Sequence, residues 1–150
     1  MSTTIATTVP TTGTGHSVRW GRYALVGLGT IAAAVLANVV VYFLGGALVA
    51  YDPQFLPLTD VSGAIIFTLP AAIVAVLLYA ALLRFARRPE RTFALIAAVV
   101  FVVTLIPDLT YIPTVPGATS AQTAILIAMH VAAAAVIVGM LTKLGRPQGR

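Results

Sequence analysis

The amino-acid sequence predicts an all-α integral membrane protein, a four-transmembrane-helix bundle with both termini cytoplasmic. Of its 150 residues, 59% are hydrophobic and only 9% are charged, and the mean hydropathy is +1.01. A soluble domain of this size cannot cover so much apolar surface with so few charges. The apolar residues collect into four runs, each near the roughly 20 residues that a helix needs to cross the hydrocarbon layer. All nine lysines and arginines lie outside these runs.

Three parts are expected along the chain. Residues 1–18 are rich in threonine and glycine and have no apolar periodicity, so we expect a disordered cytoplasmic tail. The membrane domain is predicted to cover residues 19–142, and residues 143–150 form a short basic cytoplasmic tail. The predicted spans are about 23–49, 61–83, 92–111 and 121–141.

The first apolar run extends from Tyr23 to Val49 and is too long for the core of a signal peptide. It is therefore interpreted as a retained first span. Because it is longer than the hydrocarbon layer is thick, the helix is expected to tilt or to fray near Gly45 and Gly46. A loop containing two prolines, residues 50–60, follows.

Prolines mark the two middle helices. Pro70 lies inside the second span, where it is expected to kink the helix and to leave the carbonyl of Ile66 without its usual donor. The third run, residues 92–106, ends before Pro107 and is short for a span. Either this helix stops there, or it continues past a kink at Pro107, and the continuation is favoured because it restores a spanning length.

Charge placement predicts the orientation. If the chain crosses four times, every basic residue falls on one side of the membrane. The loops 50–60 and 107–120 fall on the other side, and their only charged residues are Asp52, Asp60 and Asp108. The positive-inside rule places the basic side in the cytoplasm, and there it is expected to contact anionic lipid headgroups and not nucleic acid. The residues assigned to topology and headgroup contact are Arg19, Arg22, Arg84, Arg87, Arg88, Arg91, Lys143 and Arg146.

Three features interrupt the spans at a similar depth, about 14 Å from the outer helix ends at the helical rise: Asn38, Pro70 and His130. One interpretation is a small polar site for a proton or ion, made by Asn38, His130 and the free Ile66 carbonyl. The other is a neutral His–Asn hydrogen bond that only joins helices. The second is favoured, because no carboxylate is expected beside them within the membrane.

Other chemistry finds little support in the sequence. The chain has no cysteine, no nucleophile with a base, no phosphate-binding loop and no metal-ligand spacing. We therefore expect no catalytic residues, no metal and no cofactor, and no enzymatic activity. The last helix carries a stripe of small residues, Ala128, Ala132, Ala135 and Gly139, whose spacing permits close contact with another helix.

Three stretches resemble an uncharacterised family of bacterial four-span membrane proteins, a domain of unknown function. They are YDPQFLPL after the first span, IPTVPGATS before the last, and AILIAMHVAAAAVIVGML, which contains Met129 and His130. The resemblance covers about residues 19–141. It implies a four-span fold and a bacterial cytoplasmic (inner) membrane location, and it implies no activity, substrate or cofactor.

These observations predict a small structural or accessory membrane protein that packs with itself, as a homo-oligomer, or with a larger membrane partner. The alternative is a minimal transporter or proton-responsive channel that uses His130 and Asn38.

Overall fold

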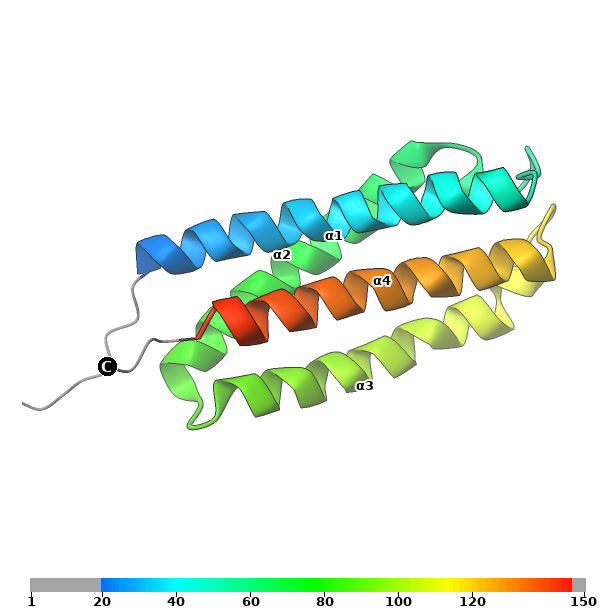
Figure 1. The fold of residues 1–150 in the computed structure, drawn as a ribbon. Coiled ribbons are helices and arrows are strands. Elements are labelled where there is room, and N and C mark those ends of the chain that lie inside the picture. Colours follow the sequence, from blue (N-terminus) through cyan, green and yellow to red (C-terminus); the bar gives the residue numbers. More distant parts are fainter. Residues whose placement is uncertain (1–19, 147–150) are drawn as a thin grey trace, which may run out of the picture.

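Four long helices lie side by side in the computed structural model, which describes residues 20–146 (Figure 1). The elements are α1 (Trp20–Leu48), η1 (Leu56–Leu58), α2 (Val61–Phe85), α3 (Pro89–Thr110), η2 (Ile112–Thr114) and α4 (Ser120–Leu144). Each long helix is long and apolar enough to cross a membrane. The prediction of an all-helical chain with four membrane-spanning helices is therefore confirmed for this part of the protein. The predicted tail at residues 1–18 lies outside it.

Two helix boundaries differ from the predicted ones around the arginine hairpin, the stretch that contains Arg84, Arg87, Arg88 and Arg91. α2 continues through Arg84 to Phe85, and α3 begins at Pro89, so only residues 86–88 connect them. Proline suits the first helical position, because its missing N–H has no partner there anyway and its φ is already helical. Long arginine side chains reach water from a helix end, so the helices extend further than the apolar run alone.

α3 does not stop at Pro107. It continues to Thr110, and the backbone N–H of Tyr111 closes the last turn on the carbonyl oxygen of Pro107 at 2.8 Å. The favoured alternative, a helix that passes through Pro107, is confirmed. Asp108, which is predicted to lie in the loop, is consequently a helical residue.

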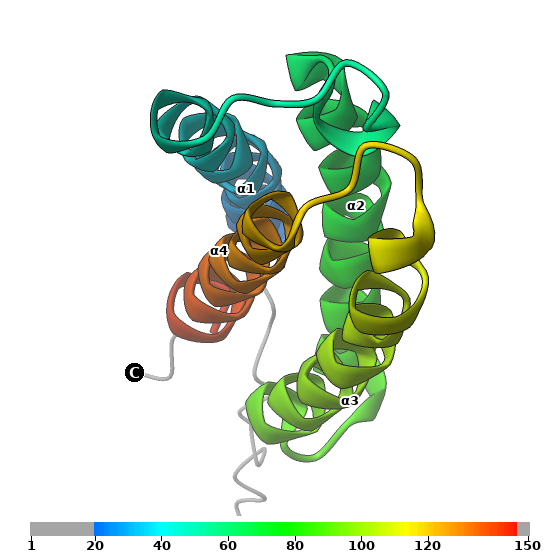
Figure 2. The same cartoon turned by 90° about the vertical axis from the view of Figure 1, so that its right-hand side faces the viewer.

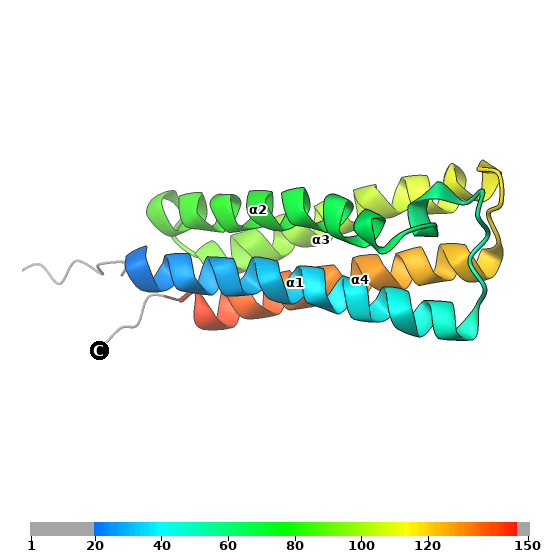
Figure 3. The same cartoon turned by 90° about the horizontal axis from the view of Figure 1, so that it is seen from above.

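Successive helices run in opposite directions, so the bundle has two distinct ends (Figure 3). The arginine end holds the start of α1, the connection 86–88 and the end of α4, and the loop end holds the connections 49–60 and 111–119. α4 contacts all three other long helices, whereas α3 packs on α2 and α4 (Figure 2).

Each end has its own core. At the arginine end Tyr79 and Phe93 are buried together, with ring centroids 5.1 Å apart. At the loop end Phe55 and Leu58, both from the first loop, are completely buried against Ala64 and Met129. The loop end is therefore closed by its own connection and does not lie open.

Glycines let the loops pack this closely. Gly117 has a φ of 75°, and a Cβ atom there would lie 2.8 Å from Oδ1 of Asp52 in the other loop. Gly45 is buried under Tyr51, whose hydroxyl donates to the carbonyl of Tyr42 at 2.6 Å. The predicted fraying of the first helix near Gly45 is wrong, because that glycine makes room for an aromatic side chain and the helix continues to Leu48.

Candidate functional site

A carboxylate and an imidazole meet between α3 and α4. Oδ2 of Asp108 lies 3.0 Å from Nδ1 of His130, and Asp108 is only 7% exposed. Both residues belong to apolar segments long enough to span a membrane, Pro89–Thr114 and Ser120–Leu144. We call these two residues the Asp108–His130 pair. The expectation that no carboxylate lies beside His130 is wrong.

Local structure explains why Asp108 turns inward. Because the helix continues through Pro107, Asp108 is held on the next helical position, about 100° around the axis from the proline. Pro107 is exposed and Asp108 is buried, so the residue that lacks an N–H is on the outer face while the carboxylate faces α4.

The hydrogen bonding of His130 identifies its proton. Nδ1 lies 3.1 Å from the carbonyl oxygen of Leu126, one turn earlier in α4. A carbonyl only accepts, so we assign the hydrogen of the neutral ring to Nδ1, which leaves Nε2 as the atom that takes up a further proton.

The 3.0 Å contact between Nδ1 and Oδ2 of Asp108 does not have hydrogen-bond geometry, and Oδ2 is buried without accepting a hydrogen bond from any described residue. A buried carboxylate without a donor is costly when charged. It is stabilised by a proton of its own or by a positive charge on the imidazole beside it.

Few other ionisable groups lie in this half of the bundle. Among the described residues, the other ionisable side chains in the loop-end half are Tyr42, Tyr51, Asp52, Asp60 and Tyr111. Among residues 20–146 the only other ion pair joins Arg146 to Glu90 at 3.9 Å, and it lies at the arginine end. The net charge of the Asp108–His130 pair therefore depends mainly on how many protons the pair itself holds.

Asn38 takes part in a separate contact. Its Nδ2 donates to Oγ1 of Thr68 at 2.7 Å, and Thr68 in turn donates to the carbonyl of Ala64 at 2.6 Å, all of it buried. This chain joins α1 to α2. The predicted hydrogen bond between Asn38 and His130 is wrong, because each side chain has a partner on a different helix.

Pro70 points elsewhere again. It is exposed, and Ile66, whose carbonyl loses its donor, is 62% exposed. Both therefore lie on the outer face of α2, while Thr68 faces inward to Asn38. Asn38, Pro70 and His130, which are predicted to lie at one depth, therefore do not form one site. Asn38 belongs to an α1–α2 contact, Pro70 lies on an outer helix surface, and His130 belongs to the Asp108–His130 pair.

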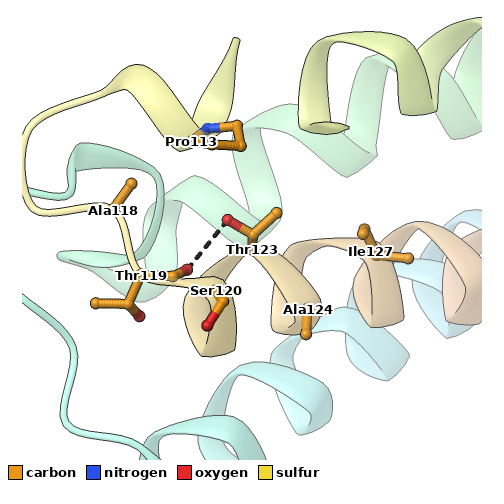
Figure 4. Close-up of a pocket in the computed structure, with 7 residues that line it drawn as sticks. All are labelled: Pro113, Ala118, Thr119, Ser120, Thr123, Ala124 and Ile127. Atoms are coloured by element: carbon orange, nitrogen blue, oxygen red, sulfur yellow. Dashed lines mark hydrogen bonds between the residues drawn. The ribbon is translucent and has the colours of Figure 1, made fainter. Parts of the chain in front are cut away.

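A hollow of about 310 Å³ at the loop end carries no titratable group (Figure 4). Two of its three hydroxyls already hydrogen-bond to the backbone at the start of α4. Thr119 accepts from the N–H of Gln122 at 3.2 Å, and Thr123 donates to the carbonyl of Thr119 at 3.1 Å. The residues that line it are Pro113, Ala118, Thr119, Ser120, Thr123, Ala124 and Ile127.

The basic residues gather at the arginine end, and all those described are exposed. They are Arg22, Arg84, Arg87, Arg88, Arg91, Lys143 and Arg146, while Arg19 lies outside the described residues. Nε of Arg146 also donates to the carbonyl of Thr142 at 2.6 Å. The separation of cations from aspartates that the sequence predicted is thus a separation between the two ends of the bundle.

The comparison with known families agrees with the resemblance noted from the sequence. A family model described as a family of unknown function, DUF6069, matches residues 15–147. The chain belongs to DUF6069. The match includes all four helices, so the family corresponds to the whole bundle and not to one part of it. No curated protein and no solved structure matches the chain.

Proposed function

We propose that this DUF6069 protein is a proton-responsive membrane protein whose working site is the Asp108–His130 pair. The observation that carries the proposal is the 3.0 Å contact between the carboxylate and the imidazole inside two apolar spans. Ionisable residues within spans are costly, and they mark ion or proton sites more often than other intramembrane residues do. The proposal includes no enzymatic reaction, metal or cofactor.

Proton counting describes how the site works. With Asp108 ionised and His130 neutral, the pair carries a charge of −1. A proton from the aqueous phase that binds Nε2 of His130 converts the ring to an imidazolium and brings the pair to zero. Apolar surroundings favour the neutral pair over the charged one, so they favour uptake of this proton.

Infrared difference spectroscopy of the protein in liposomes tests this directly. Acidification should produce an imidazolium band that is absent in His130→Gln, and it should shift the carboxylate bands of Asp108, a shift that is absent in Asp108→Asn. Glu90→Gln is the matched control, because it removes an acidic group at the arginine end and should leave these bands unchanged. A wild-type spectrum identical to those of both pair variants would overturn the proposal.

Proton flux separates a sensor from a transporter. The flux across the same liposomes is measured for the wild type and for His130→Ala. A flux that depends on pH and disappears in the variant identifies transport. No flux together with intact spectral changes identifies a proton sensor.

An accessory role through helix packing is the second candidate. On α4, Ala128 and Ala135 face outward, and a Cβ at Gly139 would meet nothing within 4 Å. A second helix therefore finds room along this stripe. Under this candidate, Ala135→Leu or Gly139→Leu changes the oligomer size in mild detergent and His130→Ala does not, whereas an unchanged size in both stripe variants argues against it.

We propose further that the arginine end faces the cytoplasm of a bacterial cell and contacts anionic headgroups of its inner membrane. The support is the charge pattern, because seven exposed cations lie at that end among the described residues and two exposed or partly exposed aspartates, Asp52 and Asp60, lie in the opposite loop. Cytoplasmic flanks of spans are enriched in lysine and arginine.

A further inference from the structure

Helix α3 has only two buried residues, and between them Ile96, Ala97, Phe101 and Leu105 are partly buried. Its buried residues are Phe93, near the arginine end, and Asp108, near the loop end. They are separated by 15 residues (108 − 93), which is about 22 Å at the helical rise. No residue between them is buried.

The two attachment points differ in chemistry. Phe93 is 1% exposed and packs on Tyr79, and the connection from α2 to α3 beside it is only residues 86–88 long. This contact is apolar and does not respond to pH. Asp108 is held instead by its contact with His130, whose strength depends on charge.

From this we infer that α3 is a hinged helix, fixed at Phe93, whose loop end is held against α4 while the Asp108–His130 pair is protonated and moves away when the pair loses its proton. The inference rests on the proposed proton site and adds what that site controls. Without the proton, Asp108 is a buried anion with no aligned hydrogen-bond donor. The carboxylate lies two residues before the end of α3, so a small movement brings it to water.

The rest of the loop end limits the movement. Ile112 and Val115, which follow α3, are partly buried against the cluster around Phe55. The expected change is therefore a local separation of α3 from α4 at Asp108 and not a detachment of the helix. A lateral separation of about 3 Å, the diameter of one water molecule, is sufficient to place water beside the carboxylate.

Other titratable groups at this end are Tyr42, Tyr51, Asp52, Asp60 and Tyr111, on α1 and in the two connections, and α2 contributes none there. Burial raises the pKa of Tyr51, and hydrogen bonds from Ser62 lower the pKa of Asp60. Both shifts move the pKa of the group away from neutral pH, so neither group explains a movement of α3 near neutral pH. The Asp108→Asn variant separates the pair from the remaining groups.

Distances between paired spin labels test the hinge, because the chain has no native cysteine to label by accident. One pair of labels reports on the loop end, at Leu109→Cys in α3 and Ala128→Cys in α4, both exposed positions. The matched control pair reports on the arginine end, at Leu95→Cys and Leu144→Cys, which are also exposed. Both are measured in lipid nanodiscs at about pH 5 and about pH 9, on either side of the ordinary histidine range.

The loop-end distance should increase by about 3 Å at the higher pH, the width of one water molecule, while the arginine-end distance stays constant. In Asp108→Asn the loop-end distance should not depend on pH, because no anion forms. His130→Gln is the second variant, and it should remain in the separated state at both pH values. A constant arginine-end distance shows that each variant is folded.

Failure of the hinge is distinguishable from failure of the proton site. If the infrared bands of the pair titrate but the loop-end distance does not change, the hinge is overturned and the proton site stands. If the bands do not titrate, or if the distance changes equally in Asp108→Asn, the hinge is overturned, and in the former case so is the proposed function.

Discussion

Single polar residues connect particular pairs of helices in this bundle. Asn38 and Thr68 connect α1 to α2 through a buried side-chain hydrogen bond, and Oδ1 of Asn38 has no described donor. Such a hydrogen bond stabilises the bundle by less free energy than the same bond would be expected to contribute in pure hydrocarbon. The reason is that the polar side chains of separated helices also find hydrogen-bond partners in the membrane.

A double-mutant cycle measures this contact. Asn38→Leu and Thr68→Val should each destabilise the bundle, and their coupling free energy should be about 0.5–1.5 kcal/mol, the range found for hydrogen bonds between membrane helices. The readout is the free energy of unfolding in bicelles. Effects that add without coupling mean that the hydrogen bond contributes nothing to stability.

Asp60 provides a pH-dependent contact outside the spans. Its carboxylate caps α2 by accepting from the N–H of Ser62 at 2.7 Å, and hydrogen bonds from the side chain and backbone of Ser62 lower the pKa of Asp60 below its ordinary value of 3.8. A lowered pKa means that the cap stabilises the first turn above that ordinary value and is lost as the pH falls through the lowered one.

Hydrogen exchange at the start of α2 should therefore be constant above about pH 5 and should lose protection in strong acid. The measurement is the protection factor of the Ser62 amide in nanodiscs, corrected for the intrinsic rate. Asp60→Asn keeps a capping side chain and should abolish the dependence on pH. Equal loss of protection in the variant would assign the effect to another group.

At the scale of elements, small residues on α1 let its neighbours approach. Gly27 lies under Val76 of α2, and Gly45 lies under Tyr51 and against Ile125 of α4, where a built Cβ would be 2.9 Å from a side-chain carbon of Ile125. Helices that pack this closely gain van der Waals contact, which is the main source of association in lipid.

Alanine at Gly45 should therefore destabilise the protein, although alanine is the better helix former. Overpacking costs about 1–3 kcal/mol, whereas the gain in helix propensity is about 1 kcal/mol. Gly29→Ala on the same helix is the matched control, since its Cβ would make only an ordinary contact with Met140 at 3.9 Å. The measurement is the free energy of unfolding, and equal values for both variants would contradict the packing at Tyr51.

At the scale of the whole molecule, charge is divided between the two ends, and this division carries the proposed orientation. The first connection holds Asp52 and Asp60 and no cation, and the described cations are all at the arginine end. Loops rich in lysine and arginine are retained in the cytoplasm during insertion.

Labelling of introduced cysteines tests the orientation. Gln54→Cys, an exposed position in the first loop, should react with an impermeant reagent added to intact cells. A cysteine added after Arg150 should react only after the membrane is permeabilised. The reverse pattern would invert the proposed topology. Lysines introduced at Gln54 and Thr59, combined with loss of the four hairpin arginines, should give a mixed orientation, because the charge difference is then reduced.

Much of the fold follows from the sequence because the bilayer restricts the possible structures so strongly. Runs of apolar residues predict four helices, since a chain in lipid must satisfy its own backbone hydrogen bonds. The length requirement also predicts that α3 continues through Pro107, and the structure confirms this. The helix ends at the arginine hairpin are less accurate, because arginine is compatible both with a helix end and with a loop.

The sequence also contains a signal for the candidate site. A third span continuing to residue 111 places Asp108 inside the membrane segment, and His130 lies inside the next one. The loop boundaries instead predict Asp108 in the loop, and the depth along the helices predicts a pairing of His130 with Asn38. Depth along a helix is calculable from residue counts, but the direction in which a side chain points around the axis depends on which helices are neighbours.

The sequence by itself thus determined the number of helices, their apolar character and the separation of cations from aspartates. Only the tertiary structure decided that Asn38 meets Thr68, that Asp108 meets His130, and that Phe55 closes the loop end. The physical reason is that burial in lipid is a property of each segment alone. A contact between polar side chains depends instead on the relative rotation of two helices, and that rotation is set by packing over their whole length.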